Sequence, residues 1–220
     1  MPNSSPTGAA TNRYRIETMC TGPFQTNLYL PHDSQTRRCW LFDCGFEGEE
    51  IISWIEASGA SLQAIWLTHG HIDHVADVEL VADHFKVPFY LHSADQPMLE
   101  TLAMQGRLFG LSCRNVRSPD SDITPALTQI GELACDIRHV PGHSPGSVVF
   151  WFPALEVLIA GDTVFDMSIG RTDLPGGDHA TLLNAIHGQI MTLPPETRIL
   201  PGHMGPTTVG REAASNPYLH

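Results

Sequence analysis

Apolar residues along the chain fall into short runs that end in turns containing Gly, Pro or Asp. Runs of this length, rich in β-branched and aromatic side chains, are typical of β-strands. The run 38–42, for example, ends at Asp43-Cys44-Gly45. The predicted strands are 14–20, 27–30, 38–42, 64–67, 87–91, 134–140, 148–152, 157–160 and 198–200.

A second pattern, with apolar residues three and four positions apart, predicts helices. In 49–58 this pattern is formed by isoleucines and stops at Gly59, a residue that favours helix ends. The segment 107–128 has several Ser, Pro and Asp residues and is predicted to be irregular. The other predicted helices are 77–85, 93–104, 179–191 and 209–214.

The predicted strands form two groups along the chain, and each group is followed by helices. This order favours an α+β protein in which two sheets pack face to face with helices outside. Neither a repeat nor a linker divides the sequence. We therefore expect one domain over 13–220, preceded by a flexible tail over 1–12, which is rich in Ser, Pro, Thr and Gly.

Composition narrows the possible partners. The chain has 24 acidic and 12 basic residues, a formal net charge of -12, so we expect no nucleic-acid partner. No apolar run reaches the roughly 20 residues that span a bilayer, and 1–12 lacks the pattern of a signal peptide, so we expect no membrane partner. The 5 cysteines show no paired spacing, which favours a reducing cytoplasm over a disulfide framework.

The densest group of metal-ligand residues is the string Thr68-His69-Gly70-His71-Ile72-Asp73-His74, directly after a predicted buried strand. Imidazole and carboxylate groups are the ligands that zinc and similar ions prefer. Gly70 permits a tight turn, so neighbouring side chains can converge. His69 and His71 can hold one ion while Asp73 and His74 face a second. The alternative, chance histidines on a surface loop, is disfavoured by four ligand residues at this spacing.

Three further candidate ligands follow predicted strands later in the chain. His143 lies in Pro-Gly-His-Ser-Pro-Gly, Asp162 in Gly-Asp-Thr, and His203 in Pro-Gly-His. Each stands beside a glycine where a strand enters a loop, and binding residues are common on loops held by a rigid scaffold. A single histidine in this position would more often be structural. Together with the HxHxDH string, the three residues predict one shared site.

In this order the motifs resemble those of the metallo-β-lactamase superfamily, over about 14–219. The resemblance implies an αββα sandwich of two mixed β-sheets flanked by helices, with metals at one edge of the sheets. It also implies that one ion is held by three histidines, a second by Asp, His and His, and that Asp162 bridges them. These two implied sets are His69, His71 and His143, and Asp73, His74 and His203.

Within the superfamily, a His directly after the Asp of HxHxDH and an Asp at position 162 are similar to the glyoxalase II branch. The sequences at 105–110, 170–178 and 216–219 resemble its short, single-domain bacterial members. Two positions depart from the pattern. Cys44 stands where relatives usually have Pro or Thr and places a thiol near the metals, and Met204 is an apparent insertion in the pocket wall. Neither removes a ligand.

The predicted function is hydrolysis of a thioester, of the hydroxyacylglutathione type. Two divalent ions lower the pKa of a bridging water towards about 7, so that hydroxide attacks the carbonyl. Asp73 and Asp162 are the candidate catalytic residues, because their charges balance the ions. Zinc is the first choice of metal, with iron or manganese as alternatives. The expected partner is a small-molecule thioester, and the sequence leaves the oligomeric state open.

Other functions fit part of the pattern. An iron-dependent persulfide dioxygenase and a lactonase are the alternatives, although the stretch 174–177 favours the hydrolases. A tRNA-processing nuclease shares HxHxDH but is disfavoured by the acidic charge, and a non-enzymatic role is disfavoured by the complete ligand set. Arg171 is a candidate anchor for a substrate carboxylate, against a structural ion pair with Asp173 or Asp178, which we favour. For Cys44 we favour packing over reactivity.

Overall fold

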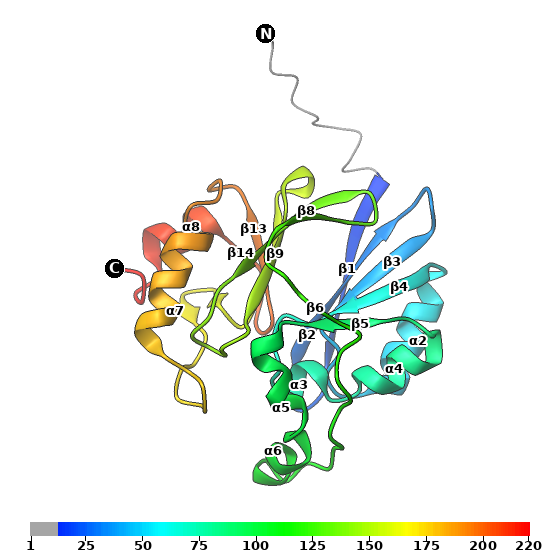
Figure 1. The fold of residues 1–220 in the computed structure, drawn as a ribbon. Coiled ribbons are helices and arrows are strands. Elements are labelled where there is room, and N and C mark those ends of the chain that lie inside the picture. Colours follow the sequence, from blue (N-terminus) through cyan, green and yellow to red (C-terminus); the bar gives the residue numbers. More distant parts are fainter. Residues whose placement is uncertain (1–12) are drawn as a thin grey trace.

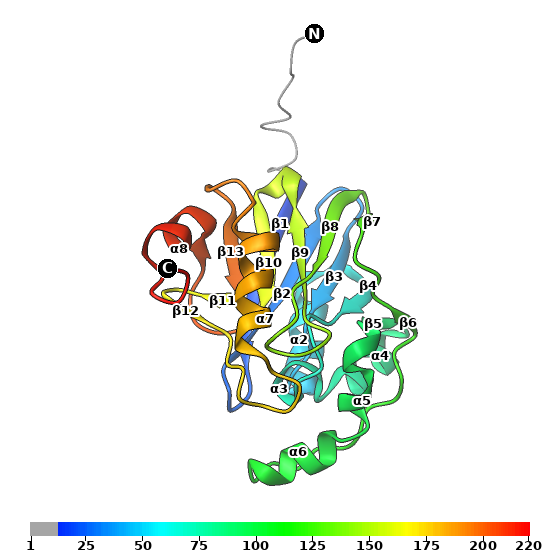
Figure 2. The ribbon, with the colours of Figure 1, turned by 60° about the vertical axis from the view of Figure 1, so that its left-hand side comes forward.

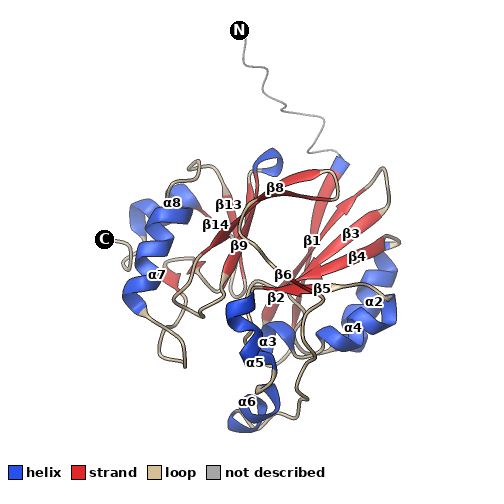
Figure 3. Cartoon of the chain, in the orientation of Figure 1, coloured by secondary structure: helices blue, strands red, loops and turns tan. Residues whose placement is uncertain are grey.

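Two β-sheets lie face to face, with helices on their outer sides (Figure 1). The computed structural model describes residues 13–220, so the tail expected over 1–12 lies outside the described residues. The alternation of layers is clearest when helices and strands are coloured separately (Figure 3). The prediction of an αββα sandwich with two mixed sheets is confirmed.

The first sheet contains six strands in chain order, β1-β2-β3-β4-β5-β6. The pairs β1–β2 and β2–β3 are antiparallel, and the remaining pairs are parallel. Its strands are β1 (Tyr14–Thr21), β2 (Thr26–Asp33), β3 (Arg38–Phe42), β4 (Ser61–Trp66), β5 (Phe89–Leu91) and β6 (Ser121–Asp122). Its helices are α2 (Gly48–Ser58), α3 (Ile72–Val75), α4 (Val78–Phe85), α5 (Gln96–Leu99) and α6 (Leu102–Leu108).

The second sheet also contains six strands, in the order β14-β13-β10-β9-β8-β7. Only β10 and β13 pair in parallel there, which makes this sheet mixed as well. Its strands are β7 (Leu127–Ile130), β8 (Leu133–His139), β9 (Val148–Phe152), β10 (Val157–Gly161), β13 (Arg198–Pro201) and β14 (Thr207–Thr208). A small hairpin, β11 (Val164–Phe165) with β12 (Ser168–Ile169), follows β10, and the helices are α7 (His179–Ala185) and α8 (Val209–Ser215).

The central strands are apolar on both faces because both faces are buried. In β9, Phe150 and Phe152 point into the cluster between the sheets, whereas Val149 joins the cluster beneath α7. Phe42 of the first sheet meets Phe150 edge to face, with ring centroids 4.9 Å apart. This alternation explains why the sequence shows continuous apolar runs in these strands.

Several elements differ from the sequence-based expectation. The helix expected over 93–104 is divided into a short 3-10 turn, α5 and α6. The break between α5 and α6 falls at Thr101, whose ψ of 4° lies outside the helical region. Strand β6 lies wholly, and strand β7 partly, inside the segment 107–128, which the sequence predicts to be irregular. The short helix α3 and the hairpin β11–β12 were not predicted. No helix within residues 13–220 has the length and apolarity needed to cross a bilayer.

Candidate metal centre

The ligand residues lie at one end of the two sheets, where strands pass into loops. The loop after β4 carries His69 and His71 into α3, which carries Asp73 and His74. The loops after β8, β10 and β13 supply the three remaining residues from the second sheet. The structure brings all seven predicted ligand residues into one cluster: His69, His71, Asp73, His74, His143, Asp162 and His203.

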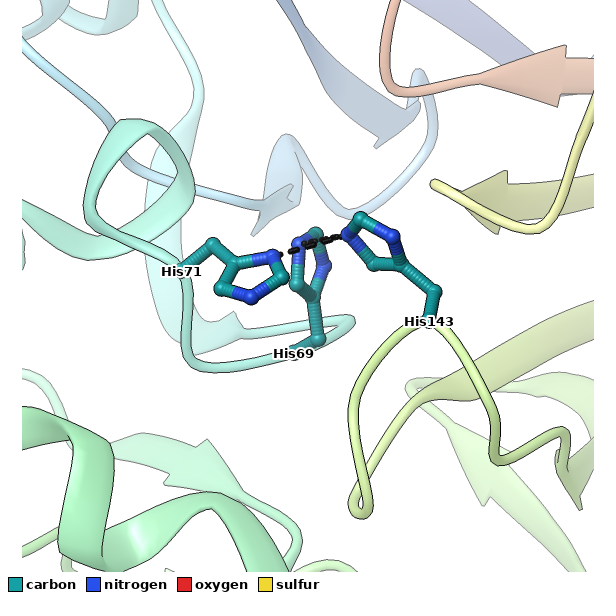
Figure 4. Close-up of side chains that lie close together, drawn as sticks. All are labelled: His69, His71 and His143. Atoms are coloured by element: carbon teal, nitrogen blue, oxygen red, sulfur yellow. Dashed lines mark hydrogen bonds between the residues drawn. The ribbon is translucent and has the colours of Figure 1, made fainter. Parts of the chain in front are cut away.

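Three histidines form the first ligand group (Figure 4). The Nδ1 atom of His71 lies 2.8 Å from Nε2 of His143, which is in turn 3.2 Å from Nε2 of His69. The three ligand atoms of this group lie within 4.8 Å of one another. All three side chains are buried, so the imidazole nitrogens face one another rather than bulk water.

The second ligand group contains Asp73, His74 and His203. Asp73 Oδ2 lies 3.1 Å from Nε2 of His203 and 3.5 Å from Nε2 of His74. Asp162 lies between the two groups. One of its oxygens is 3.3 Å from His74 Nε2, and the other is 3.3 Å from His203 Nε2 and 3.6 Å from His143 Nε2. A single carboxylate therefore contacts both groups.

The side chains fit divalent cations. The buried Nε2 atom of His74 and one oxygen of Asp162 have no hydrogen-bond partner among the described residues, which is unusual for buried polar atoms. Imidazole nitrogen and carboxylate oxygen are also the donor types that zinc, iron and manganese accept. The free donor atoms and their chemistry therefore agree on metal binding.

Burial and the neighbouring charges shift the pKa values of the ligand histidines in opposite directions. Burial and, to a smaller extent, the neighbouring His143 together lower the pKa of His71 to about 3. Burial also opposes protonation of His203, but hydrogen bonds to Asp162 and Asp73 outweigh it and raise the pKa of His203 to about 10. In the same way, the carboxylates around His74 raise its pKa well above the ordinary value against the effect of burial. Without metal, these protons balance the carboxylates, and divalent ions would replace them.

Three outer contacts orient the ligand rings. Asp43 Oδ2 lies 2.9 Å from His74 Nδ1 and accepts from the Thr68 hydroxyl, which is 3.0 Å from His69 Nδ1. On the other side of the cluster, His143 Nδ1 lies 2.8 Å from the backbone carbonyl oxygen of Arg171. Partners of this kind fix the orientation of a ligand imidazole and raise its basicity. In each case the Nε2 atom is left to face the cluster.

Asp95 joins two of the ligand-bearing loops. Its carboxylate is completely buried and accepts hydrogen bonds from the backbone N–H groups of Gly70 and Gly146, at 2.9 and 2.6 Å. It also accepts from the hydroxyl of Ser144, at 2.6 Å. Gly70 separates two ligand histidines, and Ser144 directly follows His143. Asp95 therefore holds the loop from the first sheet against the loop from the second.

We expect Asp95→Asn to weaken metal binding by about tenfold to a hundredfold, the usual effect of losing an outer partner. The amide has one oxygen where the carboxylate has two, and its NH2 group would face hydrogen-bond donors. Metal titration of the apo-protein measures the effect. Asp122→Asn is the matched control, because the exposed Asp122 accepts one backbone N–H from Ser93 at 2.7 Å. Equal metal affinity in the two variants would remove Asp95 from this role.

The remaining candidate residues have clear positions. Arg171 forms a two-pronged ion pair with Asp173, at 2.7 and 2.8 Å, as we favoured over a free substrate anchor. Cys44 is fully buried in the core of the first sheet, which agrees with packing, and burial raises the pKa of its thiol. Met204 lines the pocket in front of the cluster with 59% of its surface exposed.

Comparison with known proteins defines the class. Residues 21–203 match the model of the Metallo-beta-lactamase superfamily, and the chain belongs to that family. With the ligand cluster, this makes the protein a metallo-hydrolase of that superfamily.

Particular relatives cover nearly the whole chain. Hydroxyacylglutathione hydrolase GloC of Haemophilus influenzae is 34% identical over 208 residues, covering 93% of this chain and 98% of the relative. The crystal structure of BLEG-1 B3 metallo-beta-lactamase has a TM-score of 0.88 at 38% identity, covering 93% of this chain and 99% of that one. The crystal structure of TTHA1623 in a di-iron-bound form has a TM-score of 0.86 at 36% identity, covering 92% of this chain and 100% of that one.

Proposed function

We propose that the protein hydrolyses thioesters of the hydroxyacylglutathione type at a centre of two divalent ions. The observation that carries this proposal is that Asp162 contacts both ligand groups, through His143 of the first and through His74 and His203 of the second. In the proposed roles, each group would hold one ion, and the carboxylate of Asp162 would be a ligand common to both groups. The 34% identity to a hydroxyacylglutathione hydrolase supports the substrate class. Zinc is our first choice of metal, and the di-iron form of one similar structure supports iron as an alternative.

The chain's own residues prepare the reaction. When bound, two divalent ions lower the pKa of a water molecule to about 7 and polarise a carbonyl. The carboxylates of Asp73 and Asp162 balance that positive charge inside a largely buried cluster. His203 and Asp73 are the more exposed ligands, with 23% and 15% of their side-chain surface accessible, so a substrate reaches the centre from their side. Asp43 and the Arg171 carbonyl hold the histidine rings while the substrate binds.

The proposed setting follows from charge and composition. The net charge of -12 supports a small-molecule thioester as the partner rather than a nucleic acid. The unpaired spacing of the cysteines supports a cytoplasmic location.

A substrate panel tests the proposed activity. With metal-loaded protein, we expect S-lactoylglutathione or a simple acetyl thioester to be cleaved under nitrogen, because hydrolysis consumes water and no oxygen. Released thiol is measured with a thiol reagent, and dissolved oxygen with an electrode. Oxygen uptake with glutathione persulfide and no release of thiol from thioesters would show the dioxygenase instead. A lactone in the same panel tests the lactonase.

A second candidate activity is hydrolysis of β-lactams. The observation in its favour is the 38% identity and TM-score of 0.88 to a B3 metallo-beta-lactamase. Both reactions add water to a carbonyl, so the same ligand cluster suits them. Turnover of a chromogenic cephalosporin at a higher kcat/KM than any thioester would favour this candidate over the proposed one.

A further inference from the structure

The pocket in front of the ligand cluster, about 400 Å³ in volume, exposes more apolar than polar surface. Phe24 lies between β1 and β2, and Phe109 follows the end of α6. Phe165 belongs to β11, and Leu174 lies on the segment before α7. Helix α6, which brings Phe109 to the pocket, extends beyond the body of the sandwich (Figure 2). We call the following residues the apolar wall: Phe24, Phe109, Phe165, Leu174 and Met204.

Aromatic packing holds part of the apolar wall in place. The ring of Phe24 meets Phe109 edge to face, with centroids 5.4 Å apart, and lies 6.3 Å from the ring of Phe46. Yet 48% of Phe109 is exposed, as is 59% of Met204. Exposed apolar groups gathered in one concave site are typical of a ligand-binding surface. A ligand that covers them gains the free energy of removing apolar area from water.

The charges at the pocket disfavour an anionic ligand. Among the described residues, Arg171 is the one Lys or Arg in the pocket lining, and its guanidinium is engaged by both oxygens of Asp173. Arg211 of α8 is likewise paired, with Asp166 at 2.9 Å. A substrate carboxylate would have to compete with an existing ion pair. An uncharged group meets no such competition.

We propose that the preferred substrate carries an uncharged, apolar group next to the scissile bond, and that this group binds against the apolar wall. The inference rests on the proposed thioester hydrolysis and ranks neutral, apolar thioesters above the glutathione thioesters named there. The apolar group belongs either to the acyl chain or to the leaving thiol. Either an apolar acyl chain or an apolar thiol would place methylene groups against the side chains of the apolar wall.

Two series of neutral thioesters separate these sources. The first holds the thiol fixed as N-acetylcysteamine and lengthens the acyl chain from acetyl through butanoyl and hexanoyl to octanoyl. The second holds acetyl fixed and lengthens an uncharged alkyl thiol. We expect kcat/KM to rise by about twofold to fourfold per added methylene in at least one series, until the pocket is filled. We also expect the best neutral substrate to exceed S-lactoylglutathione.

Variants of the apolar wall test whether it causes the preference. In Phe109→Ser and in Leu174→Ser, the ratio of kcat/KM between the longest and shortest substrate should fall at least tenfold. Leu127→Ser is the control, because Leu127 lies on β7 and is 74% exposed away from the pocket lining, so its ratio should equal that of the wild type. Circular dichroism confirms that each variant is folded.

The outcomes distinguish the two proposals. No cleavage of any thioester, S-lactoylglutathione included, overturns the proposed thioesterase function, and this inference with it. Cleavage of S-lactoylglutathione with no cleavage in either neutral series overturns the inference alone. Cleavage that is independent of chain length in both series overturns the inference alone, as does a higher kcat/KM for S-lactoylglutathione. A chain-length effect that survives in both variants also overturns the assignment to the apolar wall.

Discussion

Asp162→Ala is expected to lose at least one bound metal ion and to lower kcat by more than a hundredfold. The reason is its position, with oxygens 3.3 Å from both His74 and His203 and 3.6 Å from His143. Removal of an outer partner typically costs tenfold to a hundredfold in affinity or activity, and loss of a shared ligand should cost more. Elemental analysis of reconstituted protein should give about two ions per chain for the wild type.

Asp173→Ala is the control for this experiment. Asp173 is exposed and pairs with Arg171, so its loss removes a negative charge near the pocket without touching the ligand cluster. This variant should keep both ions. Wild-type protein that never exceeds one ion per chain under metal excess would contradict the two-metal proposal. Full occupancy and normal turnover in Asp162→Ala would contradict the bridging role.

Gly202→Ala is expected to disrupt the centre although no ligand is changed. A methyl group on Gly202 would overlap Oδ1 of Asp162 and lie 2.7 Å from Cε1 of His74. The backbone has little freedom to move away, since Gly202 N–H donates to Gly161 and its carbonyl accepts from Asn27, at 2.9 and 2.7 Å. Displaced ligands should weaken metal binding and lower kcat by at least about tenfold.

The neighbouring Gly205→Ala provides a matched comparison. Gly205 lies in the same loop, and a methyl group there would meet nothing within 4 Å. The two substitutions add the same atoms three positions apart. Metal affinity, measured by competition with a chromophoric chelator, should fall in Gly202→Ala and stay at the wild-type value in Gly205→Ala. Equal affinities would show that the close approach at Gly202 does not constrain the ligands.

The sequence predicts the ligand cluster well because each ligand has a local marker. His69, His71, Asp73 and His74 stand within one short string, and the three later residues stand beside glycines at strand ends. Asp43 stands at a strand end near Gly45 but has no ligand residue beside it, and Asp95 has neither marker. Each becomes significant only because folding brings it against a loop distant in sequence, as when Asp95 meets the loop that carries His143. The role of Arg171 through its carbonyl is invisible for a different reason, since a backbone oxygen is present at every position.

The elements of the fold that the sequence does not predict also depend on contacts between distant residues or on backbone conformation. Buried strands such as β9 and β10 are recognisable because both of their faces are apolar. Strand β7 is not recognisable in the sequence, because its residues, such as the exposed Leu127, do not form an apolar run. It is a strand because its backbone pairs with that of β8. The break between α5 and α6 depends on the backbone at Thr101, which a periodic apolar pattern does not report.

Each sheet is built from one continuous half of the chain, yet the ligand cluster draws residues from both halves. Ions held by the whole cluster would therefore link the two sheets to each other. Their binding would stabilise the packed arrangement of the two sheets, because a ligand that binds only the folded form raises its free energy of unfolding. The concentration of available metal ions would then affect the free energy of unfolding of the protein as well as its activity.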